Sequence, residues 1–226
     1  MEKSAVIDWS LIIAIGIAWG SSFMFIKISA PAVGPMTLVF YRLFIASLIL
    51  TPIFIRKKYL QNIKEDIVPI LFLSFINAAI PFYLFSNAAL EVNAGTMSVL
   101  NGTTPLFAFI IATLWLKLSS NWIQLTGIFI GMVGLFIFVG YESIEFSLLA
   151  IIFCLIASFL YGFSLNFIFR TKEIEPTYLA SITLLIATFI TFPFIFLENG
   201  IDLNQPNEVL LSVGLLGFLC TGMAYM

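Results

Sequence analysis

Long hydrophobic stretches separated by short polar segments dominate the chain. The apolar runs lie near 9–30, 35–55, 67–88, 94–116, 122–140, 145–169, 177–197 and 209–226. A helix of about 20 residues crosses roughly 30 Å of hydrocarbon. The runs are continuous and rich in Leu, Ile and Phe, whereas β-barrel strands show as ~10-residue alternating segments. The pattern therefore predicts an all-α protein, a polytopic transmembrane helical bundle with eight spans.

Composition and charge narrow the range of functions. Of the 226 residues, 61% are apolar and only 10% are charged, against roughly 25% charged in globular proteins. A net charge of −2 without a basic tract argues against nucleic acid as a partner. The chain has no histidine, which excludes a Ser-His dyad and an HExxH zinc site. We expect no catalytic residue, metal or cofactor, and hence no enzyme.

The charged residues between the spans fall on opposite sides of the predicted membrane. The basic ones, all on one side, are Lys3, Arg56, Lys57, Lys58, Lys64, Lys117, Arg170 and Lys172. The acidic ones on the other side are Glu91, Glu142, Glu145, Glu198, Asp202 and Glu208. Because basic loops stay in the cytoplasm, we predict a multi-pass protein of the plasma (inner) membrane with a cytoplasmic N-terminus.

Three consecutive spans recur later in the chain. "WGSSFMFI" from Trp19 resembles "YGFSLNFI" from Tyr161 at an offset of 142, which pairs Gly20 with Gly162. The second span matches the seventh at an offset of 141, and "SFINAAIPFY" matches "GFLCTGMAYM" more weakly at an offset of 143. Such self-similarity indicates an internal repeat.

The repeat unit would contain five spans. Because five is odd, the second copy would be inverted relative to the first, as in many secondary transporters. We assign residues 1–140 to the first repeat and 141–226 to an incomplete second repeat with three helices. Met226 corresponds to the middle of the third span of the first copy. We therefore expect two further spans and a complete length of roughly 280–300 residues.

Two spans combine asparagine with a proline four residues later. Asn77 precedes Pro81, and Asn101 precedes Pro105. Proline lacks an N–H and crowds the carbonyl at i−4, so each helix is expected to kink and free the asparagine carbonyl. On the fourth span, Thr104 shares a face with Asn101. Such a face either holds helices together or lines a water-accessible pocket.

Lys27 and Arg42 are the cations within the predicted spans. Lys27 lies near the outer end of its helix, on the face of Gly16 and Gly20, where a GxxxG pattern favours close packing against protein. Arg42 lies about 10 Å deeper than the outer surface, where an unpaired arginine would cost about 2–3 kcal/mol. Its acceptor could be Glu91, a freed carbonyl or an anionic cargo.

Several of these segments together resemble a known family. They are "WGSSFMFIK" at 19–27, "FYRLFIASLIL" at 40–50 and "NAGTMSVLNGTTPLFAFIIATLWLK" at 93–117. The chain resembles EamA-type members of the drug/metabolite transporter superfamily over essentially its whole length. One departure is "LKLSS" from Leu116, where members often carry an acidic "LGE"-like ending.

The resemblance implies ten helices in two inverted repeats, cytoplasmic termini and a central cavity that opens alternately to each side. It implies export of amino acids, other small metabolites or drugs. Our hypothesis is a secondary transporter that exports small metabolites, with homodimerisation left open. The predicted cavity wall consists of Trp19, Ser22, Lys27, Arg42, Asn77, Tyr83, Asn101, Thr104, Tyr161 and Asn166. The alternatives are a non-transporting membrane scaffold and an inactive truncated fragment.

Overall fold

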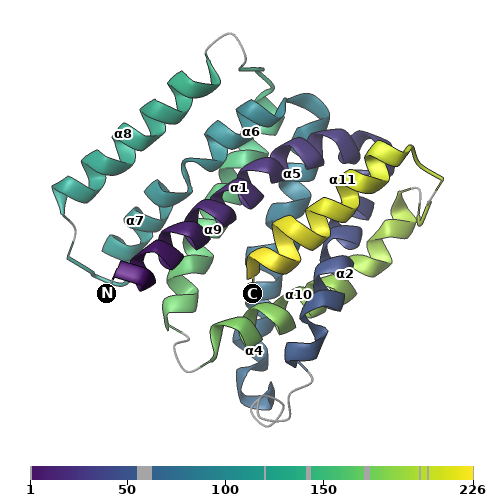
Figure 1. The fold of residues 1–226 in the computed structure, drawn as a ribbon, viewed down its shortest axis with the longest axis horizontal. Helices are drawn as coiled ribbons and strands as arrows, with labels where there is room; N and C mark the ends of the chain where they lie inside the picture. Colours follow the sequence, from purple (N-terminus) through teal and green to yellow (C-terminus); the bar gives the residue numbers. More distant parts are fainter. Residues whose placement is uncertain are drawn as a thin grey trace.

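The helices form one bundle in the computed structural model, which describes residues 2–54, 63–119, 121–140, 144–170, 174–198, 200–202 and 204–225 (Figure 1). No strand occurs in these ranges. The α-helices are α1 Glu2–Val33, α2 Pro35–Phe54, α4 Ile63–Leu73, α5 Ile80–Glu91, α6 Ala94–Asn101, α7 Thr104–Leu114, α8 Trp122–Val139, α9 Leu148–Arg170, α10 Pro176–Thr191 and α11 Asn207–Gly217. Shorter 3₁₀ and π segments are η1 Ser74–Ala79, η3 Phe192–Leu197, η4 Phe218–Gly222 and η5 Met223–Tyr225.

The predicted polytopic helical bundle is confirmed. Within the described ranges, seven helical stretches are long and apolar enough to cross a membrane. The expected span near 122–140 is the helix α8, whose apolar stretch Trp122–Phe138 falls just below the length of those seven. Its start is fixed by Asn121, whose side chain accepts a hydrogen bond from the backbone N–H of Ile123 at 3.0 Å. Gly140, with φ +83°, ends the helix, because the left-handed region favours glycine.

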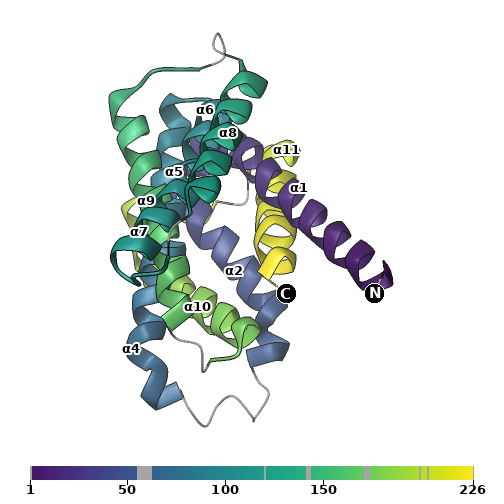
Figure 2. The same cartoon turned by 90° about the vertical axis from the view of Figure 1, so that its left-hand side faces the viewer.

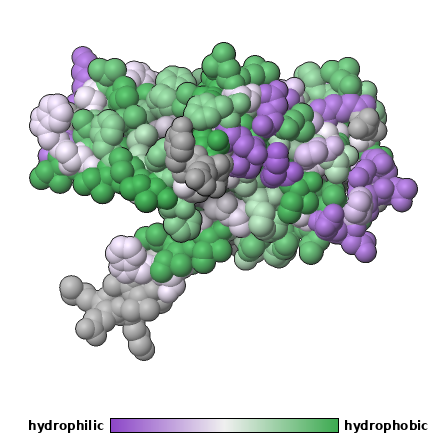
Figure 3. All heavy atoms as spheres, turned by 90° about the horizontal axis from the view of Figure 1, so that it is seen from above, coloured by the Kyte–Doolittle hydropathy of each residue, from purple (hydrophilic) through white to green (hydrophobic). Residues whose placement is uncertain are grey.

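Most neighbouring helices come from distant parts of the sequence. α2 packs along α10, α9 packs against α5 and α7, and α1 packs against α11. The first half of α1 projects away from the bundle (Figure 2). In Figure 3 most of the visible surface is hydrophobic, with hydrophilic side chains mainly in the right half of the view. A hydrophobic exterior is what a lipid environment requires of a helical bundle.

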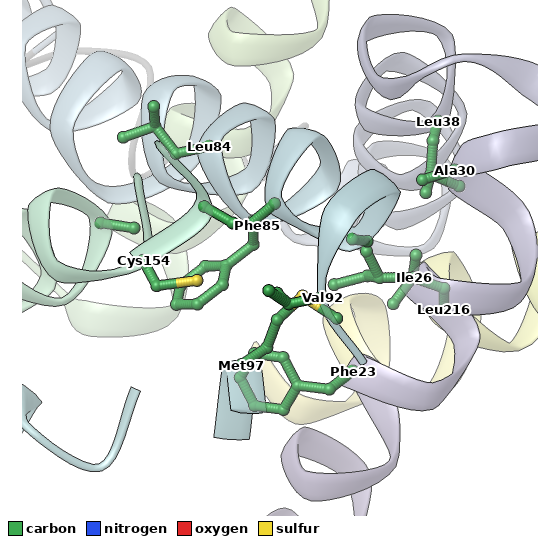
Figure 4. Close-up of a cluster of buried hydrophobic side chains, with 14 of the residues drawn as sticks. Phe23, Ile26, Ala30, Leu38, Leu84, Phe85, Val92, Met97, Cys154 and Leu216 are labelled. Carbon is green, nitrogen blue, oxygen red and sulfur yellow. The ribbon is translucent and has the colours of Figure 1, made fainter. Parts of the chain in front are cut away.

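The largest buried cluster joins α1, α2, α5, α6, α9, α11 and η4 (Figure 4). Phe23 of α1 meets Phe85 of α5 edge to face, with ring centroids 5.3 Å apart. Met97 and Cys154 are fully buried beside them. This packing fixes α1 against α5 and α9 immediately beside the cavity described below.

Two predicted spans are interrupted next to their prolines. The π-helix Ser74–Ala79 ends just before Pro81 in the first turn of α5. The fourth span divides into α6 and α7 at a turn of Gly102 and Thr103, and Pro105 lies in the first turn of α7. Proline is tolerated in a first helical turn because those N–H groups have no intrahelical partner. The backbone is therefore irregular at two neighbouring places inside the bundle.

A carboxylate joins the start of α2 to the end of η3. Glu198 accepts hydrogen bonds from the backbone N–H groups of Met36, at 3.0 and 3.1 Å, and Thr37, at 3.1 Å. A carboxylate is favourable at a helix N-terminus, where the helix dipole is positive. Gly34, with φ +89°, makes the preceding turn, and a Cβ there would collide with the Glu198 carboxylate. Because the start of α2 thus lies beside the segment that follows α10, α2 and α10 run antiparallel.

Candidate functional site

A cavity of about 270 Å³ lies inside the bundle, among α1, α2, η1, α5, α6, α7, α9 and η5. It adjoins both interrupted spans, because Asn77 of η1 and Asn101 of α6 line it. The lining residues are Trp19, Ser22, Phe23, Ile26, Arg42, Asn77, Phe82, Phe85, Asn101, Thr104, Tyr161, Leu165, Ile168 and Tyr225. Aromatic and aliphatic side chains with a few polar groups are typical of small-molecule pockets.

Arg42 supplies the positive charge of the cavity. Its side chain is 7% exposed, its Nε donates a hydrogen bond to Thr221 Oγ1 at 2.7 Å, and its guanidinium carbon lies 3.6 Å from the centroid of the Phe82 ring. The Thr221 hydroxyl donates to the Leu216 carbonyl at 2.9 Å, so its oxygen is oriented to accept from Arg42. Glu91, considered above as an acceptor, is exposed and instead accepts a hydrogen bond from Ser147.

The two asparagines of the cavity use their oxygens within the protein. The Ser164 hydroxyl donates to Asn77 Oδ1 at 2.7 Å, and the Thr104 hydroxyl donates to Asn101 Oδ1 at 3.3 Å. In this arrangement Asn101 adds its NH₂ group to the cavity as a donor, whereas the Asn77 side chain also hydrogen-bonds to Tyr225.

Aromatic rings form much of the remaining wall. Trp19 and Tyr225 lie with centroids 6.4 Å apart, and Phe85 stacks on Tyr161 at 6.1 Å with an interplanar angle of 17°. Rings at these distances interact favourably with one another, and the faces that they turn to the cavity are apolar.

Seven of the predicted wall residues line the cavity: Trp19, Ser22, Arg42, Asn77, Asn101, Thr104 and Tyr161. Lys27, Tyr83 and Asn166 do not. Lys27 Nζ donates to the carbonyl of Ala89 near the end of α5 at 2.9 Å, because a cation at this depth needs an acceptor and the last carbonyls of a helix provide one.

The other two predicted residues outside the wall have structural contacts. Asn166 donates from Nδ2 to the carbonyls of Ala108, at 3.0 Å, and Gly162, at 2.9 Å, and so links α9 to α7. The Tyr83 side chain packs against the cluster between α2 and α10.

The expected GxxxG packing surface does not form within the described part of the chain. A Cβ added to Gly16 or Gly20 would meet nothing within 4 Å. Both glycines are exposed, so no helix among the described residues packs against them.

Sequence reasoning missed Thr221 and Tyr225, one holding Arg42 and the other lining the cavity. Both lie near the end of the chain, in the weakest of the three repeat matches. That match pairs Tyr225 with Phe82 at an offset of 143. The pairing was the one available signal, since Phe82 and Tyr225 both line the cavity.

Residues paired by the sequence offsets have matching local structures. Ser22 donates to the carbonyl of Trp19 at 2.5 Å, and Ser164 donates to the carbonyl of Tyr161 at 2.9 Å. Adding the offset of 143 to the residue numbers of the π-helix Ser74–Ala79 gives 217–222, a range that contains the second π-helix, Phe218–Gly222.

One such pair is in direct contact. The hydroxyls of Ser47 on α2 and Thr188 on α10, 141 residues apart, lie 2.8 Å from each other. Contact between equivalent positions is what a twofold axis through the α2–α10 interface would produce.

Comparison with known families gives one match. The sequence profile of the EamA-like transporter family matches residues 9–140, more than half of the chain. No curated protein matches the chain.

Proposed function

Because the chain belongs to the EamA-like transporter family, we propose that this multi-pass membrane protein is a secondary transporter that exports small metabolites by alternating access. The observation that carries the proposal is the cavity of about 270 Å³, which places a buried cation and two asparagines among aromatic rings inside an apolar bundle. Polar groups are costly in such surroundings and mark pathways and binding sites in membrane proteins.

We further propose that two inverted repeats, residues 1–140 and 141–226, build this site. The paired π-helices, the paired serines and the contact between Ser47 and Thr188 support the division. The antiparallel course of α2 and α10 supports the inversion. In such folds the substrate site lies between the repeats, and rocking of one repeat against the other exposes it to each side.

The proposed location is the plasma (inner) membrane with a cytoplasmic N-terminus. The support is the distribution of basic residues between the spans. Of those eight residues, all but Lys117 have side chains outside the described residues.

Flux through liposomes tests the transporter directly. We expect liposomes that contain the chain to release at least one class of preloaded small solute, among carboxylates, neutral amino acids and amines, faster than protein-free liposomes. The release should be saturable, because a solute must occupy the cavity before it is released and the number of cavities is limited. Equal release from both kinds of liposome for every class would contradict the proposal.

The scaffold alternative predicts a different result. If the polar face only bound partner helices, Asn101→Leu would change the oligomeric state in detergent and leave solute release unchanged. If the face belongs to a transport site, Asn101→Leu lowers solute release while the oligomeric state stays the same.

A further inference from the structure

The cavity carries one formal charge, and that charge is positive. Among its lining residues Arg42 is the only ionisable side chain other than the tyrosines. The titratable groups close enough to interact with the Arg42 charge are Tyr161, Tyr225 and Cys220, none of which is a carboxylate. Within the described residues, the cation therefore has no counter-charge.

The geometry of Arg42 leaves part of its guanidinium for a ligand. Nε is occupied by Thr221 and one face lies over Phe82. A guanidinium has five N–H donors arranged as a planar fork that matches a carboxylate in a bidentate pair. Because Arg42 is only 7% exposed, water solvates its charge poorly, and an anion bound in the cavity that it lines would stabilise that charge.

The same cavity offers little to an ammonium group. The oxygens of Asn77 and Asn101 each keep only one lone pair for a ligand, because Ser164 and Thr104 donate to the other, and the lining residues include no carboxylate to pair with an ammonium. A zwitterionic amino acid would therefore bring its ammonium into the cavity without an anionic partner, and burying an unpaired charge is costly. A cationic solute would in addition face Arg42.

The remaining wall selects the body of the ligand. Trp19, Phe85 and Tyr161 present ring surface, Leu165 and Ile168 are aliphatic, and the volume is about 270 Å³. Pockets for drug-sized molecules usually span roughly 300–1,000 Å³. The wall therefore suits a small, largely apolar body of about the size of one aromatic ring with a short side chain.

From these observations, and resting on the proposed transport function, we infer that the cavity selects small monocarboxylates with an aromatic or aliphatic body and no ammonium group. Arg42 binds the carboxylate, the Asn101 NH₂ group donates to its oxygens or to a neighbouring hydroxyl, and the rings cover the apolar body. This substrate class is narrower than amino acids, metabolites or drugs in general.

Three ligands that share a phenyl ring on a two-carbon chain and differ in charge test the inference. They are 3-phenylpropionate, phenylalanine and phenethylamine, whose binding to the purified chain is measured in detergent by calorimetry. We expect 3-phenylpropionate to bind at least about 10-fold more tightly than phenylalanine, a difference of about 1.4 kcal/mol, and phenethylamine more weakly still. These measurements need only the native chain. The inference would be overturned if phenylalanine bound as tightly as 3-phenylpropionate or more tightly, or if 3-phenylpropionate did not bind.

Variants assign the preference to Arg42. Arg42→Gln should remove the preference for the carboxylate, and Arg42→Lys should retain it with weaker binding, because lysine keeps the charge without the planar fork. Lys27→Gln is the matched control, since Lys27 contacts the Ala89 carbonyl outside the cavity wall, and its ligand preference should equal that of the native chain. An unchanged preference in Arg42→Gln would refute the role of Arg42.

Flux separates this inference from the proposed function. Binding of 3-phenylpropionate without its release from liposomes would leave the ligand class standing and count against transport. Release of phenylalanine in preference to 3-phenylpropionate would leave transport standing and overturn the ligand class.

Discussion

Gly162→Ala should destabilise the bundle by about 1–3 kcal/mol, the usual cost of overpacking a close contact. A Cβ at this position would lie 2.7 Å from the backbone nitrogen of Ala108 and 2.9 Å from the Cβ of Phe107. The nearest of these atoms is backbone and cannot rotate away, so α9 and α7 must separate. The separation would also strain the hydrogen bonds that Asn166 makes across the same interface. The midpoint of thermal unfolding in detergent, followed by tryptophan fluorescence, measures the effect.

The glycine that the sequence offset matches to Gly162 provides the control. Gly20, which the offset of 142 pairs with Gly162, would meet nothing within 4 Å if it carried a Cβ. Alanine favours a helix over glycine by about 1 kcal/mol. Gly20→Ala should therefore leave the midpoint unchanged or raise it slightly. Equal losses at the two glycines would show that the α7–α9 contact is not specifically tight.

Thr104→Phe should reduce solute release to the rate of protein-free liposomes. Thr104 lines the cavity at the start of α7. A phenyl ring added at this position fills part of a space of about 270 Å³ in which a solute would bind. The measurement is solute release from liposomes with equal amounts of native and variant protein, together with their elution on size-exclusion chromatography.

Thr126→Phe makes the same change where no transport effect is expected. Thr126 is exposed on α8 and its hydroxyl donates to the carbonyl of Ile123 in its own helix. This variant should release solute at the native rate, because its ring points outward from the bundle. Native flux through Thr104→Phe, in a protein that elutes normally, would mean that solutes pass elsewhere.

Much of the helix layout was predictable because lipid imposes simple rules on a sequence. A backbone in hydrocarbon must satisfy its own hydrogen bonds, so each run of about 20 apolar residues indicates a helix. The break before Pro105 was also foreseeable from proline chemistry, although its form, a turn at Gly102 and Thr103 between two helices, was not.

The contacts between helices were harder to predict than the helices themselves. Lys27 and Arg42 both had to find acceptors, but the sequence does not say which helices will be neighbours. One acceptor is a carbonyl of α5 and the other a threonine 179 residues away. Likewise Asn166 has the chemistry of a binding residue, and only the position of α7 shows that it holds two helices together.

Access to Thr104 from the two sides of a membrane tests the central claim, a cavity that opens alternately, most directly. The native cysteines, Cys154 and Cys220, are free and buried and would be replaced by alanine before Thr104→Cys is introduced. A membrane-impermeant thiol reagent is then applied to vesicles of each orientation, with Thr126→Cys as the control that faces outward from the bundle. The account predicts that Thr104→Cys reacts from both sides and that 3-phenylpropionate slows both reactions. Reaction from one side only, or from neither, would contradict it.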